Sequence, residues 1–252
     1  NDPAFSKKLA ALGDIYVDDA FSTAHRAHAS TEGITHFIPS YAGFLMQEEI
    51  GALSAALEDP KRPAMALVAG AKVSTKISVL ENITGKVDAM IVGGAMANTF
   101  LLATGYDIGD SMAEPDMADA ARKIMAAAER NGCALMLPVD TAGRDDKILD
   151  IGPESIRLFE AKIDEMKTVL MNGPVGVFET PPFDAGTNAL ARHIARLTRE
   201  GRLVSVAGGG DTVSALNHAG AADGFTYVST AGGAFLEWLE GKTLPAIPPL
   251  YA

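Results

Sequence analysis

The sequence predicts an α/β protein: a parallel sheet with helices on both faces, preceded by a truncated second α/β domain. From residue 64 onward, short apolar runs alternate with longer segments of helical pattern, as in chains of βαβ units. The runs are apolar throughout, as in strands buried on both faces of a sheet. Most of them are followed within a few residues by glycine, which suits a tight turn from a strand into a helix. Together these features are typical of a Rossmann-like sheet.

Six strands are predicted in this part of the chain, at residues 65–68, 89–92, 134–137, 168–171, 203–206 and, with a weaker pattern, 225–228. Residues 116–131 form a predicted helix, with Pro115 near its start and Gly132 just past its end. Residues 188–200 form another, closed by Gly201. Right-handed crossovers through such helices would place the strands parallel in one sheet.

The first sixty residues follow a different pattern. Residues 15–17 and 36–39 are short strand candidates, with a polar, histidine-containing segment between them. Residues 44–57 have apolar side chains at helical spacing, and we expect this helix to end at residues 58–60. We interpret it as a connection between a truncated first unit and the main domain.

The composition limits the classes of protein to consider. The chain has 252 residues, 48% of them hydrophobic, and a formal net charge of -11. This acidic balance argues against a non-specific nucleic-acid-binding protein, which needs a basic surface. We expect no membrane span, since no apolar stretch is long enough to cross a bilayer, and the first residues lack the pattern of a signal peptide. The single cysteine, Cys133, lies in an apolar run and is predicted to be buried and unpaired.

The loops after the predicted strands are the most informative feature of the sequence. Five of them contain glycine: Gly70-Ala71-Lys72, Gly93-Gly94-Ala95, Asn172-Gly173-Pro174-Val175-Gly176, Gly208-Gly209-Gly210-Asp211-Thr212 and Ser229-Thr230-Ala231-Gly232-Gly233. In an open α/β sheet such loops share the carboxyl edge, where ligands bind. Helices that start there point free N–H groups and a positive dipole at an anion. One pair of glycines is usually no more than a tight turn, but five such loops on one edge predict a site for a polyphosphate and a flat ring.

The standard phosphate-binding motifs do not match the sequence. No segment fits G-x-x-x-x-G-K-[ST]. Residues 93–98 depart from the dinucleotide fingerprint G-x-G-x-x-G. A nicotinamide-dependent enzyme is therefore the weaker alternative.

Two lysines follow the first glycine-ended strand. Lys72 and Lys76 are four residues apart, a spacing that on a helix places both ammonium groups on one face. They are either two solvated surface lysines or a pair that binds phosphate. Because Gly70 lies beside them, we favour phosphate binding.

Charged residues near the other loops have open interpretations. Asp211 opens a predicted helix after three glycines, so it is a helix cap, a ligand of nucleotide-bound Mg²⁺, or both. Glu179 would be a surface residue on its own, but beside a nucleotide its carboxylate could accept hydrogen bonds from ribose hydroxyls. The basic cluster His25-Arg26-Ala27-His28 could hold a small anion; its histidines are poor candidates for zinc ligands.

Taken together and in order, these segments resemble phosphoglycerate kinase. The resemblance is carried by residues 15–21 (IYVDDAF), 23–30 (TAHRAHAS), 70–73 (GAKV), 172–179 (NGPVGVFE), 208–212 (GGGDT) and 232–237 (GGAFLE). That family transfers a phosphoryl group reversibly between 1,3-bisphosphoglycerate and ADP, giving 3-phosphoglycerate and ATP, and its two α/β domains close about a hinge. The resemblance implies ADP or ATP and phosphoglycerate as ligands, Mg²⁺ as cofactor, and a cytoplasmic monomer without nucleic-acid or membrane partners.

The resemblance also implies a role for each matching residue. Lys72 would stabilise the phosphoryl group in flight, Arg26 would contact the phosphoglycerate, and the Gly232-Gly233 turn, also part of the catalytic set, would offer N–H groups to the substrate side. The nucleotide would be bound by Lys76, Gly94, Asn172, Glu179, Gly208, Gly209, Gly210, Asp211 and Thr212. Among these, Asp211 would hold Mg²⁺ and Thr212 would cap the phosphate-binding helix. The residue types agree with phosphoryl transfer, which needs fixed cations, dipoles and a metal.

The resemblance divides the chain into a remnant of the N-terminal substrate domain (1–39), an interdomain helix (40–59), the nucleotide-binding domain (60–235) and a C-terminal tail (236–252). Ala69 and Ala231 stand where the family usually has glycine, a mild change that we expect the site to survive. The family's N-terminal segment, with its D-x-N and H-x-x-R-P motifs, has no counterpart in the sequence. We therefore expect competent nucleotide binding, and the alternative function is that of an inactive, stand-alone nucleotide-binding fragment.

Overall fold

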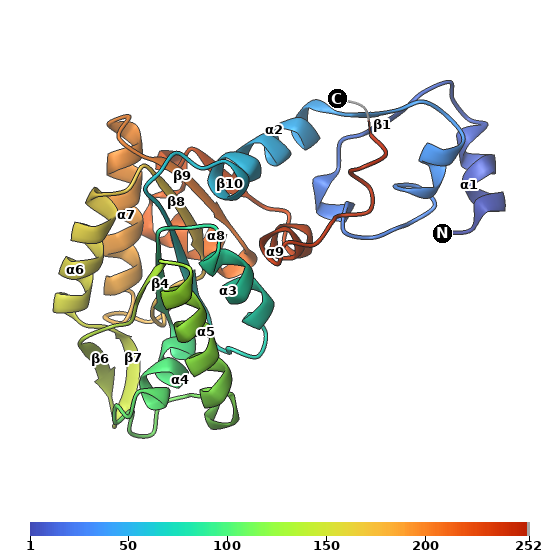
Figure 1. The fold of residues 1–252 in the computed structure, drawn as a ribbon. Helices are drawn as coiled ribbons and strands as arrows, with labels where there is room; N and C mark the ends of the chain where they lie inside the picture. The colour runs from blue at the N-terminus through green and yellow to red at the C-terminus, as the bar shows by residue number, and fades with distance from the viewer. Residues whose placement is uncertain (251–252) are drawn as a thin grey trace.

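The computed structural model of the chain describes residues 1–250, which form a six-stranded parallel sheet with helices on both faces and a smaller N-terminal unit beside it (Figure 1). The strands of the sheet are β3 (Ala64–Ala69), β4 (Ala89–Gly93), β5 (Ala134–Met136), β8 (Thr168–Asn172), β9 (Val204–Gly208) and β10 (Tyr227–Ser229). All six predicted strands are therefore confirmed. The weakest one begins at Tyr227, because Phe225 still ends the preceding turn of 3₁₀ helix.

The strand order places the centre of the sheet at β3 and β8. The order is β10-β9-β8-β3-β4-β5. The strands β3, β4 and β5 therefore follow one another from the centre to one edge, and β8, β9 and β10 follow one another from the centre to the other edge. The two central strands pair in parallel from Ala64↔Thr168 to Val68↔Asn172. In open α/β sheets, the crevice beyond the carboxyl ends of such a pair is the usual place for a ligand.

Helices cover both faces of the sheet because its strands are apolar on both sides. Within β3, Ala66 and Val68 belong to one hydrophobic cluster, and Met65 and Leu67 belong to the other. The first cluster contains α3 (Ile77–Thr84), α4 (Ala95–Ala103), α5 (Ala118–Arg130) and α9 (Gly233–Leu239); the second contains α6 (Pro153–Asp164), α7 (Ala185–Arg199) and α8 (Gly210–Ala219). The prediction of a doubly covered parallel sheet is confirmed. Cys133 is also buried, as predicted, and burial raises the pKa of its thiol to about 11.

The predicted helices are confirmed with small shifts at their starts. The helix expected at 116–131 begins as a 3₁₀ turn, η4 (Pro115–Met117), and continues as α5. The helix expected at 188–200 is α7, which starts at Ala185. The helix expected at 44–57 is α2 (Phe44–Leu53), which continues without a break into a π-helical turn, η3 (Ser54–Glu58).

The N-terminal unit contains one pair of short parallel strands. Its elements are α1 (Pro3–Ala10), β1 (Tyr16–Asp18), η1 (Phe21–Thr23), η2 (Gly33–His36) and β2 (Ser40–Ala42), with Tyr16 opposite Ser40 in the register. The strand expected at 36–39 is wrong, because His36 ends a 3₁₀ turn and the strand begins only after Pro39. Pro39 has no N–H to donate to a ladder, and its carbonyl accepts from Tyr16 N instead, at 2.9 Å.

A β-hairpin beside the carboxyl edge of the sheet was not predicted from the sequence. Its strands are β6 (Thr141–Arg144) and β7 (Lys147–Ile151), which pair antiparallel. The turn between them holds Asp145 and Asp146 at positive φ angles of 51° and 59°. Two consecutive left-handed residues match the right-handed twist of a hairpin, and aspartate tolerates this conformation better than most residues.

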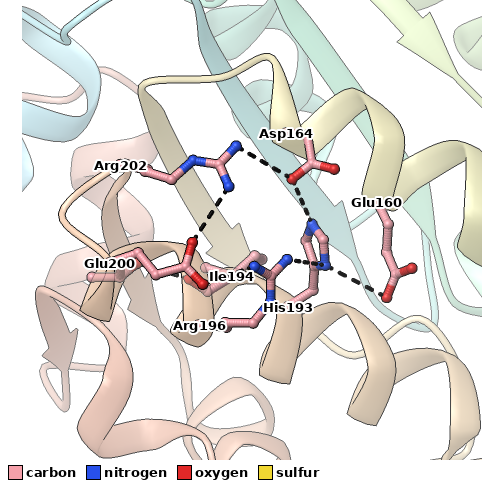
Figure 2. A network of polar contacts seen from close by, with 8 residues as sticks. Glu160, Asp164, His193, Ile194, Arg196, Glu200 and Arg202 are labelled. Atoms are coloured by element: carbon pink, nitrogen blue, oxygen red, sulfur yellow. Dashed lines mark hydrogen bonds and ion pairs between the residues drawn. The ribbon is translucent and has the colours of Figure 1, made fainter.

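The opposite end of the domain carries a network of charged side chains between α6 and α7 (Figure 2). His193 lies between two carboxylates, with Nε2 at 3.2 Å from Asp164 and Nδ1 at 3.8 Å from Glu160. Further contacts extend the network through Arg196, Glu200 and Arg202. Since α6 and α7 end where β8 and β9 begin, this network lies far from the glycine-ended loops.

The polypeptide connects the two units twice (Figure 1). Helix α2 leads from the N-terminal unit into the main domain, and the segment after α9 returns, with Ala246 N donating to Ala24 O at 3.2 Å. Phe21 and Trp238 pack beside this crossing with ring centroids 6.2 Å apart. The predicted tail, 236–252, thus includes the end of α9 and the returning segment, and its last two residues lie outside the described part. No helix of the described chain has the length and apolar character that a membrane span requires.

Candidate functional site

A cavity of about 680 Å³ opens at the carboxyl ends of the central strands. Loop residues after β3, β4 and β8 form one side of it, and β7 of the unpredicted hairpin forms another. Its lining includes Gly70, Gly94, Asn98, Pro174, Val177, Phe178, Glu179, Ile148, Leu149, Asp150 and Asp211. The cavity therefore has the position expected from the strand order, and its wall combines apolar side chains with a few polar groups, as small-molecule sites do.

Glycine allows the loops at the centre of the sheet to touch backbone to backbone. Gly94 has a φ of +69°, and a Cβ at this position would lie 2.7 Å from the carbonyl oxygen of Gly70. Gly173 has a φ of +113°, and its Cβ would lie 2.0 Å from the carbonyl oxygen of Ala69. No larger residue fits at either position, so the glycines bring the ends of β3, β4 and β8 together.

The two lysines of the first loop do not lie on one helical face, and this part of the sequence interpretation is wrong. Residues 70–76 form an irregular loop, and α3 begins only at Ile77. Lys72 is exposed at this loop, while Lys76 turns back into the sheet edge. The Lys76 ammonium donates to Ala69 O at 2.6 Å, to Asn172 Oδ1 at 2.6 Å and to Asn172 O at 3.3 Å. Burial lowers the pKa of Lys76 to about 8, partly offset by the charge of Asp211.

The amide of Asn172 extends this contact to the next strand. Its Nδ2 donates to Gly208 O at 2.8 Å, so Asn172 joins the Lys76 ammonium to the end of β9. The Thr212 hydroxyl donates to the same carbonyl and accepts from Gly173 N, both at 2.8 Å. Asn172 and Thr212 are both almost fully buried. Hydrogen bonds thus fix three strand ends to one another at the edge of the cavity.

The start of α8 differs from the predicted capping pattern. Gly209, with a φ of +100°, is the N-cap, and the helix begins at Gly210. Asp211 therefore lies inside the first turn, and Thr212, expected to cap the helix, is buried below it, with its hydroxyl bonded to Gly208. The first N–H groups of α8 remain free to face an anion.

Asp211 is the candidate metal ligand of this site. It is exposed and lines the cavity at the positive end of α8. Within residues 1–250, no group of three or more histidine, cysteine or acidic side chains could hold an ion by itself. A single carboxylate suits Mg²⁺ that takes its other ligands from phosphate oxygens and water. The donor set therefore fits nucleotide-bound magnesium better than a closed structural metal site.

Glu179 lies at the mouth of the cavity. Its side chain is exposed, whereas its neighbour Phe178 is buried. The preceding loop is fixed to the hairpin, because Val177 N donates to Leu149 O at 2.8 Å. The predicted nucleotide residues from Lys76 to Thr212 thus surround one edge of the sheet, although Lys76 and Thr212 bond to protein groups there.

The residues predicted for the second substrate lie between the two units, outside the cavity lining. Arg26 forms an ion pair with Glu237 of α9, with 2.7 Å between Nη1 and Oε1. Gly232 is the N-cap of α9, with a φ of +56°. A Cβ at Gly233 would lie 2.9 Å from Nε2 of His25, so the glycine turn packs directly against the basic cluster. The structure therefore brings Arg26 and the glycine turn together on this side.

Asp150 is a buried cavity residue that the sequence analysis missed. Its Oδ1 accepts from Ile151 N at 2.8 Å, and its Oδ2 accepts from Gly186 N in the first turn of α7 at 2.7 Å. Burial is the main cause that raises the pKa of Asp150 to about 6, and the negative charge of Asp184 also raises it. The two backbone hydrogen bonds act in the opposite direction and lower the pKa. The available signal was a lone aspartate inside the apolar run at residues 148–151.

Comparisons with known proteins give a consistent result over almost the whole chain. A family model described as phosphoglycerate kinase matches residues 1–242. Phosphoglycerate kinase of Methylorubrum extorquens (strain PA1) is 55% identical over 271 aligned positions, covering 100% of this chain and 68% of the relative. That of Maricaulis maris (strain MCS10) is 56% identical, covering 98% of this chain and 66% of the relative. The chain thus spans about two thirds of the length of these relatives.

A solved structure gives the same result for the fold. The structure of phosphoglycerate kinase from Coxiella burnetii superposes with a TM-score of 0.94 at 44% identity, covering 98% of this chain and 68% of that one. This similarity includes the N-terminal unit as well as the main sheet, since nearly every residue is covered.

Proposed function

The chain belongs to the phosphoglycerate kinase family of glycolytic, ATP-binding enzymes, and on this premise we propose that it supplies the Mg-nucleotide site for phosphoryl transfer between 1,3-bisphosphoglycerate and ADP. The products would be 3-phosphoglycerate and ATP. The observation that carries this proposal is the cavity at the central strand ends, where the glycine loops, the start of α8 and Asp211 lie together.

We assign the two ends of the nucleotide to different parts of this cavity. The flat base suits the apolar wall formed by residues such as Leu149, Val177 and Phe178. The phosphates suit the free N–H groups at Gly210 and Asp211, where the helix dipole favours negative charge. Glu179 at the mouth would accept hydrogen bonds from the ribose.

Lys72 is the residue we assign to the transfer step. Among residues 1–250, no carboxylate lies within ion-pair distance of its ammonium, so its charge is available to a ligand. A fixed cation that faces the equatorial oxygens of the transferring group stabilises the charge there. Lys76 differs, because its ammonium already binds Ala69 and Asn172; it would meet a phosphate from within this hydrogen-bonded network.

Magnesium would be held by Asp211 and by the nucleotide itself. When bound, the ion would neutralise charge on the phosphates and orient them. The protein's own contribution would be the exposed carboxylate, the dipole of α8 and the apolar wall of the cavity.

The phosphoglycerate side is assigned to Arg26 and the Gly232-Gly233 turn. Arg26 would contact the anionic substrate, and N–H groups at the start of α9 would support it. The domain limits in this proposal are 1–39 for the substrate-side unit, 40–59 for the connecting helix, 60–235 for the nucleotide-binding domain and 236–252 for the tail. The proposal also includes a cytoplasmic location, which cell fractionation tests, and a monomeric state, which analytical ultracentrifugation tests.

Calorimetry and turnover together test this function. The complete gene product is expected to transfer phosphate between ATP and 3-phosphoglycerate, and the 252-residue chain is expected to bind Mg-ADP. Absence of transfer by the complete product would refute the kinase assignment. Mg-ADP binding by the 252-residue chain without turnover or 3-phosphoglycerate binding would instead support the stand-alone nucleotide-binding fragment. Tight NADH binding without ADP binding would favour a nicotinamide-dependent enzyme.

A further inference from the structure

Glu114 holds the loop that presents Lys72, through a contact to Ser74, which lies forty positions earlier in the chain. Its carboxylate accepts from Ser74 Oγ at 2.5 Å and from Ser74 N at 3.0 Å. Both oxygens are therefore bonded to one residue of the loop 70–76. In the described part of the chain, no other side chain from outside this loop hydrogen-bonds to residues 71–75.

Glu114 is itself fixed to the rigid part of the domain. Its N–H donates to Thr99 Oγ1 at 3.0 Å, and Thr99 is fully buried in α4. The neighbouring Met112 carbonyl accepts from Asn98 of the same helix at 3.0 Å. Through these bonds α4, which begins at the edge of the cavity, sets the position of the Glu114 carboxylate.

The loop needs an external anchor at this point. Its ends are secured, since Gly70 O accepts from Met96 N at 2.8 Å and the Lys76 ammonium binds Ala69 and Asn172. Between these ends only Val73 is buried, while Lys72 and Ser74 are exposed. A backbone segment with so few contacts would otherwise be mobile.

The charge of Glu114 suits this role without neutralising Lys72. Burial tends to raise the pKa of Glu114, but hydrogen bonds from Ser74, a backbone contact at Val73 and the charge of Lys72 together lower it. The carboxylate is thus ionised while its oxygens are bonded to Ser74. No ion pair forms between Glu114 and Lys72 within 4 Å, so the lysine remains available to a phosphoryl group.

We propose that Glu114 is a positioning residue for phosphoryl transfer, because it fixes through Ser74 the loop on which Lys72 meets the transferring group. The inference rests on the proposed function. A displacement of about 1 Å at a group that acts in the transition state costs on the order of 100-fold in rate, whereas ground-state nucleotide binding depends on other residues. Loss of Glu114 should therefore lower kcat more than it weakens ADP binding.

The test compares variants of the complete gene product. In Glu114→Ala, kcat is expected to fall about 10- to 100-fold, with the Kd of Mg-ADP changed by less than about threefold. Glu114→Gln keeps one acceptor and Ser74→Ala keeps the backbone bond, so each should lose less. Glu129→Gln on α5 removes the same charge from an exposed residue and serves as the matched control.

A double-mutant cycle separates positioning from a general structural effect. In a Lys72→Met background, Glu114→Ala should lower the residual kcat by less than about threefold, because the group it positions is already absent. An equal loss in both backgrounds would overturn the proposal, as would an unchanged kcat in Glu114→Ala. If Glu114→Ala does not fold, the same double-mutant cycle is made with Ser74→Ala, and the same two outcomes support or overturn the proposal. An inactive wild-type product would refute the kinase function itself, whereas an active wild type that is insensitive to Glu114 refutes only this inference.

Discussion

The guanidinium of Arg26 lies 2.7 Å from the carboxylate of Glu237, although 211 positions separate the two residues in the sequence. This ion pair joins the basic cluster of the N-terminal unit to α9 of the main domain. The hydrogen bond from Arg26 is the main cause of the lowered pKa of Glu237. The residue assigned to the anionic substrate is therefore occupied by a protein carboxylate in this structure.

Replacing Glu237 should make Arg26 easier for an anion to bind. In the complete gene product, Glu237→Gln is expected to tighten 3-phosphoglycerate binding by about two- to fivefold, the range of exposed ion pairs. Calorimetry measures this change, and it should shrink in about 0.5 M salt. Glu240→Gln, which breaks the nearby pair with Lys242, is the control. Weaker binding in Glu237→Gln would show that the pair orients Arg26 for the substrate and does not compete with it.

Lys72→Ala tests the assignment of the transfer step. Turnover should fall by about two orders of magnitude or more, while the affinity for Mg-ADP stays within about threefold, because the charge acts mainly in the transition state. Single-turnover kinetics and calorimetry give the two quantities. Lys123→Ala removes an exposed lysine from α5 and should change neither. Loss of ADP binding with normal turnover would contradict the assigned role.

Thr212→Val tests the hydrogen bonds beneath the start of α8. Valine keeps the shape of threonine but leaves Gly173 N without its acceptor and removes the bond to Gly208 O. Since these groups are buried, the free energy of unfolding should fall by ~1–3 kcal/mol. Chemical denaturation measures the change. Thr180→Val, at an exposed threonine, should cost much less, and equal losses in both variants would contradict the explanation.

The raised pKa of Asp150 predicts that the free energy of unfolding depends on pH. Its pKa is about 6 in the folded chain against an ordinary value of 3.8, so the folded chain holds this proton more tightly than the unfolded chain does. The stabilisation is fully present below about pH 4 and is lost as the pH rises through about 6. The loss is on the order of 3 kcal/mol, because each pKa unit corresponds to ~1.4 kcal/mol.

Asp150→Asn isolates this contribution. The free energy of unfolding of the wild type minus that of the variant should decrease between about pH 4 and pH 7. Urea titrations across this range measure the difference. Asp116→Asn, at an exposed position, is the control. Parallel curves for wild type and Asp150→Asn would show that the carboxylate does not carry the effect.

The charged network in Figure 2 should affect stability but not activity. His193→Ala removes contacts to Asp164 and Glu160, whose side chains are 45% and 33% exposed. The His193 side chain is only 12% exposed, but both carboxylates keep contact with water. Such partly solvated pairs contribute little, so the free energy of unfolding should fall by about 1 kcal/mol. Thermal unfolding and steady-state turnover check the two parts. A loss of turnover would mean that the end of α6 and α7 influences the distant cavity.

The strands were predictable because a strand buried on both faces of a sheet is apolar at every position, which the sequence shows directly. Every residue of β3 is fully buried, and its apolar run is unbroken. The carboxyl edge could be located for the same reason, since five of the six runs are followed by a loop that contains glycine. By contrast, β2 was placed too early, because an apolar run that includes Pro39 does not show where the ladder begins.

The contacts within the site were less predictable, since they depend on residues far apart in sequence. The spacing of Lys72 and Lys76 predicted one helical face, but the acceptors at Ala69 and Asn172 draw Lys76 into the sheet edge. Glu114 and Asp150 carried no motif, and their roles follow only from the segments that fold against them. The hairpin was missed because its turn uses two aspartates at positive φ where glycine or asparagine is more usual.

The double crossing between the two units has a mechanical consequence. One tether, α2, enters the main domain, and the other, the segment after α9, leaves it (Figure 1). A body held by a single tether can swivel in all directions, but two tethers leave it one easy rotation, about the line that joins them. An approach of Arg26 toward the cavity would then follow an arc around this line.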